Sequence, residues 1–258
     1  MILKEMEINL FNKLLTLKKE YGCVGIKSEF ENEGSDYRDL ILLRYLTAKN
    51  DLKMIIKIGG VEAFTDLKMA IHLNADGIVV PMVESEFALI KSLNMVSDLF
   101  EKDYVGFEVF INIETKTGVQ NLESILKYAG NKITGITIGR SDLSYSYDMK
   151  SEQDSIFITK KVEEIVESVR NNSNFKITVG GGISKKTCEN NYFKDRVVPK
   201  IDCIETRNVI LKSDSVYIDG ALQFALDFEK DYLKYKLMKN QMFIKQDENR
   251  FDTLMTRG

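Results

Sequence analysis

Short β-branched runs alternate with amphipathic stretches of helix length along nearly the whole chain. Strands are expected at 23–30, 53–60, 76–82, 105–115, 133–140 and 175–183, with a seventh within 200–211. Helices are expected between them, at 36–49, 61–73, 84–101, 117–129 and 155–171, with a weaker one after 183. Because hydrophobic spacing switches between strand and helix periods at each boundary, the pattern predicts a parallel sheet joined by crossover helices.

The length and the polar strand ends favour an α/β fold of the TIM or (β/α)8 barrel type, formed as one domain over residues 1–258. An extra helix at 3–21 precedes the barrel, and a long helix at 215–239 follows it. The eighth strand is expected to be short and to lie near 207–218. An open doubly wound sheet is the alternative, but the glycine fingerprint usual after its first strand is absent here.

The composition excludes several functional classes. The chain has 36 basic and 39 acidic residues, which argues against a general nucleic-acid binder. No apolar run approaches the roughly 20 residues needed to cross a bilayer, and the charged start does not resemble a cleavable signal peptide. One histidine and three scattered cysteines exclude a multi-histidine zinc site and fit a reducing cytoplasm.

Side-chain alternation in the fourth strand shows which residues face the barrel interior. Phe107, Val109, Ile111 and Ile113 share an apolar face, which should meet the outer helices. The opposite face should therefore point inward, and it carries Glu108, Phe110, Asn112 and Glu114.

The same alternation places further polar residues inside the barrel. In the first strand Val24 and Ile26 should face out, and in the second and fifth strands the isoleucines should do so. The expected inward positions are Gly25, Lys27, Glu29, Lys57, Thr137 and Gly139. Ionised groups are costly to bury unless they are paired or bind a metal. A site at the carboxyl ends of the strands is therefore expected, with a purely structural Lys27–Glu29–Lys57 network as the alternative.

Two carboxylates follow neighbouring strands and can converge on one cation. Glu114 lies in FINIET at 110–115, and Asp142 lies in GRSDL at 139–143. Two oxygens plus water and a chelating substrate suit Mg²⁺ or Mn²⁺, although another divalent cation is possible. A 2-oxo acid would chelate such an ion through its carboxylate and keto oxygens. The expected chemistry is stabilisation of an enolate by a Lewis acid.

These segments resemble the HpcH/HpaI aldolase/citrate lyase β-subunit family, built on a phosphoenolpyruvate- and pyruvate-binding barrel. The resemblance runs from the first strand to about residue 183 and is most specific at 56–85 and at the two carboxylate segments. It implies a divalent-metal-dependent carbon–carbon lyase, an aldehyde-lyase or oxo-acid-lyase acting through a pyruvate-like enolate. A 2-oxo acid and an aldehyde are the implied small-molecule partners. An oligomer is implied as well, since the last helix of the family often packs on a neighbouring subunit.

The resemblance also assigns roles to individual positions. Glu114 and Asp142 match the metal ligands, and Lys57 stands where the family usually has an arginine that binds the keto oxygen. Asn112 matches a polar pocket residue, commonly glutamine. Gly139, Arg140 and Ser141 match the segment whose backbone amides lie near the substrate carboxylate. Apart from the resemblance, the Arg140 side chain could contact a substrate carboxylate or phosphate, or pair with Asp142.

The general base is the main departure from the family pattern. Many of these aldolases have a histidine after the first strand, and Phe30 takes that place here. Glu29 is the first choice for the base because it is inward and at a strand end, and Glu84 is the second. His72, in an expected helix, is not expected to replace the histidine.

Weaker signals leave other interpretations open. Gly180–Gly182 could approach an anion or form a tight turn, and Arg207 is a further candidate from the seventh strand. An acyl-CoA lyase of the citryl or malyl type is an alternative function, as is a barrel that binds a metal and a sugar acid without catalysis.

Overall fold

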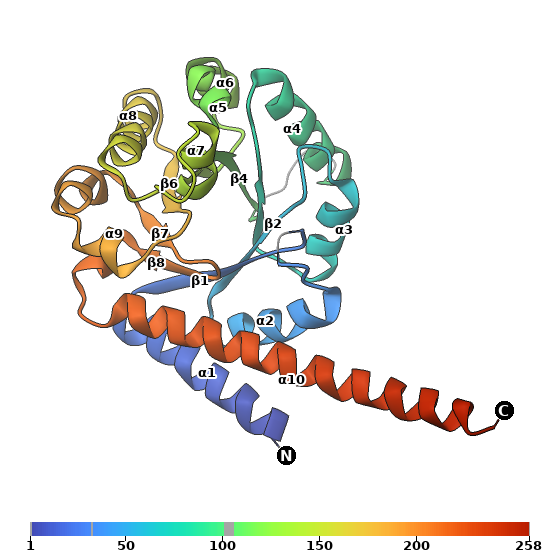
Figure 1. The fold of residues 1–258 in the computed structure, drawn as a ribbon. Helices are drawn as coiled ribbons and strands as arrows, with labels where there is room; N and C mark the ends of the chain where they lie inside the picture. The colour runs from blue at the N-terminus through green and yellow to red at the C-terminus, as the bar shows by residue number, and fades with distance from the viewer. Residues whose placement is uncertain (1, 32, 101–105, 258) are drawn as a thin grey trace.

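A computed structural model describes residues 2–31, 33–100 and 106–257. Eight strands form a closed barrel in chain order, and helices surround it (Figure 1). The strands are β1 (Cys23–Glu29), β2 (Lys53–Lys57), β3 (Gly77–Val80), β4 (Glu108–Ile113), β5 (Gly135–Gly139), β6 (Lys176–Gly180), β7 (Cys203–Glu205) and β8 (Val209–Lys212). The helices are α1 (Ile2–Glu20), α2 (Tyr37–Lys49), α3 (Phe64–His72), α4 (Glu86–Phe100), α5 (Lys116–Gln120), α6 (Leu122–Ala129), α7 (Arg140–Ser146), α8 (Ile156–Asn172), α9 (Lys185–Glu189) and α10 (Ala221–Met255), with short helical turns at Phe193–Val197, Val198–Lys200 and Ser213–Tyr217.

The barrel fold with an N-terminal helix and a long C-terminal helix is confirmed, but the last strand runs against the others. β1 to β7 pair in parallel, whereas β8 pairs antiparallel with both β7 and β1. Over the described residues 203–212, β7 and β8 are joined by a three-residue turn, Thr206–Asn208, with no helix between them. Three residues can only form a hairpin, because a parallel crossover needs a dozen or more.

Most expected elements lie where the sequence places them. The strand expected within 200–211 proves to be β7 followed by most of β8, and the loop expected after the fifth strand begins with α7. The expected end of the helix at 101 and start of the strand at 105 lie outside the described residues. The main difference is therefore at the carboxyl end of the chain, where the resemblance to the family is loosest.

The inside and outside faces of the strands follow the expected alternation. Val109, Ile111 and Ile113 join the large core between barrel and helices, whereas Phe110 belongs to a separate small cluster inside the barrel with Ile55 and Val79. Val24 is the exception, because it was expected to face out and instead lines a cavity at the amino end of the barrel. The pairing of β1 with β8 changes register beside it, between Cys23 and Gly25.

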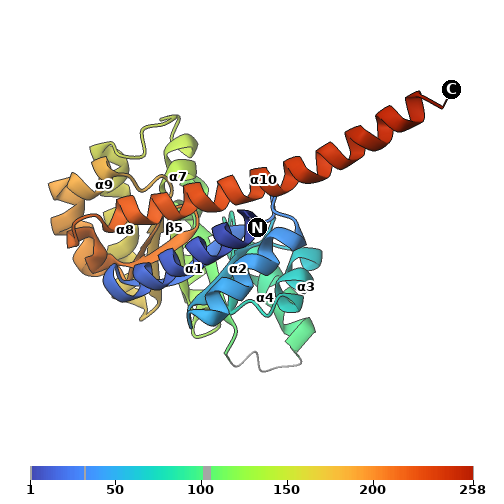
Figure 2. The same cartoon turned by 90° about the horizontal axis from the view of Figure 1, so that it is seen from below.

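α1 and α10 lie side by side across the β1 and β8 side of the barrel (Figure 1). Lys13 contacts Asp231 at 2.7 Å, and the Tyr235 hydroxyl donates to Glu7 Oε1 at 2.7 Å. The remainder of α10 projects away from the barrel (Figure 2). Among the described residues, none of the helices combines the length and apolar character that crossing a membrane requires.

Candidate active site

A cavity of about 360 Å³ opens at the carboxyl ends of the strands, where barrels of this type carry their active sites. It brings together residues from six strands or the turns after them, and from α10. The lining consists of Lys27, Glu29, Lys57, Asn112, Glu114, Gly139, Ser141, Asp142, Gly181, Gly182, Ile183, Glu205, Thr206, Arg207, Leu226 and Glu229. All the residues predicted for the site line this cavity except Arg140.

Glu114 is fixed in position at the end of β4. The next residue, Thr115, caps α5 by accepting a hydrogen bond from the amide of Gly118, which ends the strand directly after the carboxylate. Glu114 is 2% exposed, and its Oε1 accepts a hydrogen bond from the amide of Met82 at 3.0 Å. Met82 has a φ of 52°, a left-handed conformation rare outside glycine. Strain of this kind persists where the surrounding structure requires it, here beside the buried carboxylate.

Two neighbours complete the surroundings of Glu114. Asn112 donates through Nδ2 to Glu114 Oε2 at 2.9 Å, so that its Oδ1 must point elsewhere. That oxygen is buried and has no hydrogen-bond partner within the described part of the chain. Gly139 is required by the close approach of β5, since a Cβ there would lie 2.5 Å from Glu114 Oε2.

The charges of this region act on each other. Burial raises the pKa of the Glu114 carboxyl, and the nearby charge of Asp142 adds to this, while Lys57 and the two donors oppose it. Burial lowers the pKa of the Lys57 ammonium, but Glu114, Glu29 and Asp142 raise it by more, so that the net shift is upward. The three carboxylates thus favour the protonated form of Lys57.

Glu29 lies between two cations. Its carboxylate contacts Lys57 Nζ at 3.5 Å and Arg207 Nη1 at 3.2 Å. Lys27 pairs with Glu205 instead of Glu29, so the expected Lys27–Glu29–Lys57 network exists only in its Glu29–Lys57 half. The charged residues of β1 are therefore paired with Lys57 on β2, with Glu205 on β7 and with Arg207 in the β7–β8 turn.

The β7–β8 turn reaches the cavity because α10 holds it. Glu229 Oε1 accepts hydrogen bonds from Thr206 Oγ1 at 2.5 Å and from the Asn208 amide at 2.6 Å. Asn208 also donates to the backbone oxygen of Lys27 at 3.0 Å. Arg207, a weak candidate from sequence, thus projects beside Glu29. Glu205 and Glu229 were missed, although a glutamate on the otherwise apolar face of Ala225, Phe228 and Tyr232 was a detectable signal.

Arg140 is not brought together with the other predicted residues. It is 1% exposed, and its guanidinium contacts Asp154 at 3.0 Å and Thr187 Oγ1 at 3.1 Å. It also donates to the backbone oxygens of Gly180 and Gly181, at 3.3 and 3.1 Å. The side chain therefore fixes the loop after β6 and neither lines the cavity nor pairs with Asp142.

Of the remaining candidate residues, some line the cavity and others lie away from it. Gly181 and Gly182 line the cavity, both with positive φ, and a Cβ on Gly181 would lie 2.4 Å from the amide nitrogen of Arg140. Phe30 packs against the outer core, and neither Glu84 nor the exposed His72 belongs to the cavity lining. Glu29 is therefore the nearest to the cavity of the carboxylates considered for the base.

The residues present fit a hard divalent cation. Five carboxylates and three cationic side chains line the cavity, an excess of two negative charges that a dication would neutralise. The carboxylates of Glu114 and Asp142 and the unpartnered Oδ1 of Asn112 are the oxygen ligands that Mg²⁺ or Mn²⁺ prefers. Within the described ranges, no group of three or more His, Cys, Asp or Glu residues is arranged for a metal. Mg²⁺ is usually held by one or two carboxylates and keeps several water ligands.

Comparisons with known proteins agree with this architecture. The family model described as HpcH/HpaI aldolase/citrate lyase matches residues 40–179, more than half of the chain. The match includes β2 to β5 and both carboxylates, Glu114 and Asp142. No curated protein sequence matches the chain.

Solved structures with this fold are similar in shape but distant in sequence. The HpcH/HpaI aldolase from Desulfitobacterium hafniense DCB-2 has a TM-score of 0.61 at 12% identity, over 77% of this chain and 81% of that one. An HpcH/HpaI aldolase/citrate lyase family protein from Burkholderia cenocepacia J2315 has a TM-score of 0.57 at 14% identity, over 79% and 84%. The citrate synthase SbnG has a TM-score of 0.55 at 18% identity, over 88% and 89%. At these identities the likeness concerns the fold alone.

Proposed function

Because the chain belongs to the HpcH/HpaI aldolase/citrate lyase family, we propose that it is a metal-dependent carbon–carbon lyase acting on a 2-oxo acid. The observation that carries the proposal is one cavity in which Glu114 and Asp142 adjoin Lys57 and Glu29. Acidic ligands and a fixed cation at one point suit the formation of negative charge on a substrate oxygen. The reaction would cleave or form a bond between a pyruvate-like fragment and an aldehyde.

Glu114 and Asp142 would hold Mg²⁺, Mn²⁺ or another divalent ion, with Asn112 beside them. When bound, such an ion supplies Lewis-acid stabilisation of an enolate. Asn112, Gly139 and Ser141 line the wall against which the 2-oxo acid would be oriented. The buried carboxylate of Glu114 favours this role, because binding a cation relieves the cost of its burial.

Lys57 and Glu29 are the proposed catalytic residues. The Lys57 ammonium, whose pKa is raised, would donate a hydrogen bond to the substrate oxygen on which charge develops. The Glu29 carboxylate would accept a proton from the substrate and return it, oriented by Lys57 and Arg207. A lysine keeps the charge of the arginine usual in the family but presents a single donor group in place of a planar fork.

The aldehyde has space beyond Arg207. A second cavity of about 420 Å³ runs along α10 and shares Arg207, Leu226 and Glu229 with the first. We assign the far part of the substrate to this groove, since the metal and the 2-oxo acid would occupy the inner cavity.

We also propose that the protein is a cytoplasmic homo-oligomer. Cys23, Cys188 and Cys203 are all free, as in a reducing compartment. The oligomer is supported by the apolar side chains exposed on the projecting part of α10.

Exchange of the methyl protons of pyruvate in D₂O tests the function without knowledge of the aldehyde. Exchange should require Mg²⁺ or Mn²⁺, and Glu114→Gln and Lys57→Met should each slow it about 100-fold or more, since oxyanion stabilisation by one group is worth about that much. Lys57→Arg should retain part of the rate. Lys91→Met is the matched control, because Lys91 pairs with Glu62 at 2.7 Å away from the cavity.

Absence of exchange with any divalent ion, in a folded protein, contradicts the proposal. If the protein binds Mn²⁺ and pyruvate but leaves the protons in place, it is a binding barrel instead of a lyase.

A further inference from the structure

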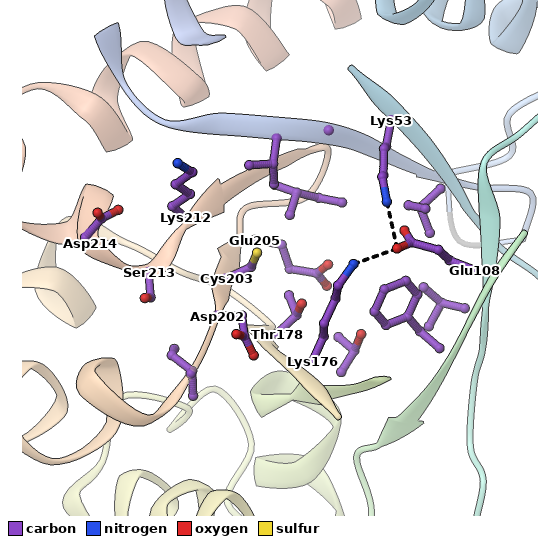
Figure 3. A pocket seen from close by; sticks show the side chains of 18 residues that line it. Lys53, Glu108, Lys176, Thr178, Asp202, Cys203, Glu205, Lys212, Ser213 and Asp214 are labelled. Atoms are coloured by element: carbon purple, nitrogen blue, oxygen red, sulfur yellow. Dashed lines mark hydrogen bonds and ion pairs between the residues drawn. The ribbon is translucent and has the colours of Figure 1, made fainter. Parts of the chain in front are cut away.

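Another cavity, of about 520 Å³, lies at the amino ends of the strands, opposite the candidate active site, and is called the amino-end cavity below (Figure 3). Ile55, Val79, Phe110 and Ile210 form its apolar walls. Cavities of this size accept small organic ligands, whereas the amino end of such barrels usually serves stability alone. The reaction proposed for the carboxyl end of the barrel does not use the residues that line this cavity.

The mouth of this cavity carries an uncompensated positive charge. Lys53 and Lys176 contact the same oxygen of Glu108, at 2.7 and 2.6 Å, and both are about half exposed (Figure 3). Burial raises the pKa of Glu108, but the two lysines lower it by more, so that it is ionised. One carboxylate thus balances two ammonium groups, and each ammonium has further N–H groups to donate.

The other charges at the mouth do not supply the missing anion. Asp202 is held by Arg170 Nη2 and by the Ile177 amide, both at 2.7 Å. The exposed Lys212 and Asp214 offset each other in charge. The position between Lys53 and Lys176 therefore remains complementary to a single negative charge.

Two hydroxyl groups deeper in the cavity lack partners. Thr137 on β5 and Thr178 on β6 line it and are only 3% and 7% exposed. Neither side-chain hydroxyl has a hydrogen bond to any described residue, and Figure 3 shows Thr178 among the side chains directed into the cavity. Neither hydroxyl is among the fully buried side-chain atoms that lack a partner, so both oxygens are open to the cavity and free to bond to a polar group of a bound molecule.

We infer that the amino-end cavity is a second ligand site, for a short aliphatic monocarboxylate that carries a hydroxyl group at its far end. The carboxylate would lie between Lys53 and Lys176, the chain against Val79 and Phe110, and the hydroxyl beside Thr137 and Thr178. Glu205 lines both cavities, so the ligand would lie on the other side of the residue that holds Lys27 in the candidate active site.

Isothermal titration with three probes of equal chain length tests the assignment. The order of affinity should be 6-hydroxyhexanoate, then hexanoate, then 1-hexanol, with about fivefold for the hydroxyl and about tenfold for the carboxylate. Saturating pyruvate should not displace 6-hydroxyhexanoate, because the two sites are at opposite ends of the barrel. Displacement would overturn the inference, whether or not the lyase proposal holds.

Variants locate the site. Lys176→Gln should weaken the binding of hexanoate about tenfold. Lys91→Gln should not, although it also removes a surface lysine, paired with its carboxylate at 2.7 Å against 2.6 Å for Lys176. Thr178→Val keeps the shape and removes the hydroxyl, so 6-hydroxyhexanoate and hexanoate should then bind with more nearly equal affinity. Unchanged binding in Lys176→Gln, equal affinity for hexanoate and 1-hexanol, or no binding by the folded protein would each refute the site.

Discussion

At the scale of single residues, the candidate active site depends on charged side chains that are buried away from water. Glu114 is ionised at a cost, since burial raises its pKa, and the charge of Lys57 together with the hydrogen bonds from Met82 and Asn112 does not fully compensate. Asp142, on the exposed side of the cavity, adds repulsion. Repulsion between the two carboxylates lowers the stability of the cation-free protein. It also favours the binding of a cation between them.

Glu114→Gln should therefore slow the proposed exchange reaction without harming the fold. A carboxyl whose folded pKa is raised stabilises the folded state only when protonated, so its charged form costs stability above that pKa. The glutamine variant should be as stable as the wild type at pH 7, or more so, and the gain should shrink as the pH falls toward the ordinary value of 4.5. Thermal unfolding between pH 4 and pH 8 measures this.

Addition of Mn²⁺ should stabilise the wild type and leave the Glu114→Gln variant unchanged. Asp142→Asn is the companion variant, since it removes the other proposed ligand from an exposed position. Equal stabilisation of both variants and the wild type by Mn²⁺ would show that the ion binds elsewhere.

Arg140 stabilises the fold and does not line the cavity proposed for the substrate. It is buried, and it satisfies Asp154, Thr187 and two backbone oxygens of the β6 loop. Arg140→Met leaves Asp154 without its cation, and we expect a loss of about 3–5 kcal/mol in the free energy of unfolding. Urea denaturation checks this, and a loss below about 1 kcal/mol would contradict the structural role.

At the scale of elements, the β7–β8 hairpin distinguishes this barrel from a regular (β/α)8 barrel, in which a helix joins each strand to the next. A three-residue turn in place of a crossover helix brings Arg207 to the cavity, and α10 adds Leu226 and Glu229 to the same lining. The turn is held by the Glu229 carboxylate, which accepts three hydrogen bonds on one oxygen, from Thr206, Asn208 and Val209.

Removal of this carboxylate should loosen the hairpin. Glu229→Ala should cost about 2 kcal/mol in the free energy of unfolding, since hydrogen bonds to a charged acceptor are lost and buried donors are left unpaired. Glu229→Gln keeps an acceptor oxygen in place and should cost less than about 1 kcal/mol. Both are measured by chemical denaturation, and equal effects of the two variants would mean that the hairpin does not depend on the hydrogen bonds.

The sequence predicts the barrel and most of the site because both follow from periodicity. Alternation in β4 alone places Asn112 and Glu114 inward, and the same rule applied to β1 and β2 finds Glu29 and Lys57. Contacts between distant elements have no such local signal. The reversal of β8, the pairing of Lys27 with Glu205 and the direction of the Arg140 side chain are decided by tertiary packing, which alternation within one strand does not encode.

At the scale of the whole molecule, the barrel is hollow at both ends. Glu205 lines both the amino-end cavity and the candidate active site. Small inward residues such as Gly25 and Thr178 leave the amino end open, and inward charged residues leave the carboxyl end polar. The outer helices supply the large apolar core, so the interior is free to hold ligands.

The last helix, α10, extends beyond the barrel and exposes apolar side chains there. α10 has 35 residues, and its buried positions end at Tyr235. Beyond it, Leu237, Ile244 and Phe251 are 55%, 57% and 62% exposed. They are seven residues apart, so they share one face of the helix, as in a helix that packs on another.

We expect this face to be covered by a second copy of the chain, since the exposed residues repeat with the period of a helix–helix contact and since the projecting segment extends beyond the barrel (Figure 2). Light scattering should give a mass of at least two chains. Ile244→Asp should reduce it to one, because an unpaired charge would be buried in the contact. Gln246→Asp, on the opposite side of the helix, should leave the mass unchanged. A monomeric wild type at high concentration, or an Ile244→Asp variant of unchanged mass, would show that the projecting helix has another role.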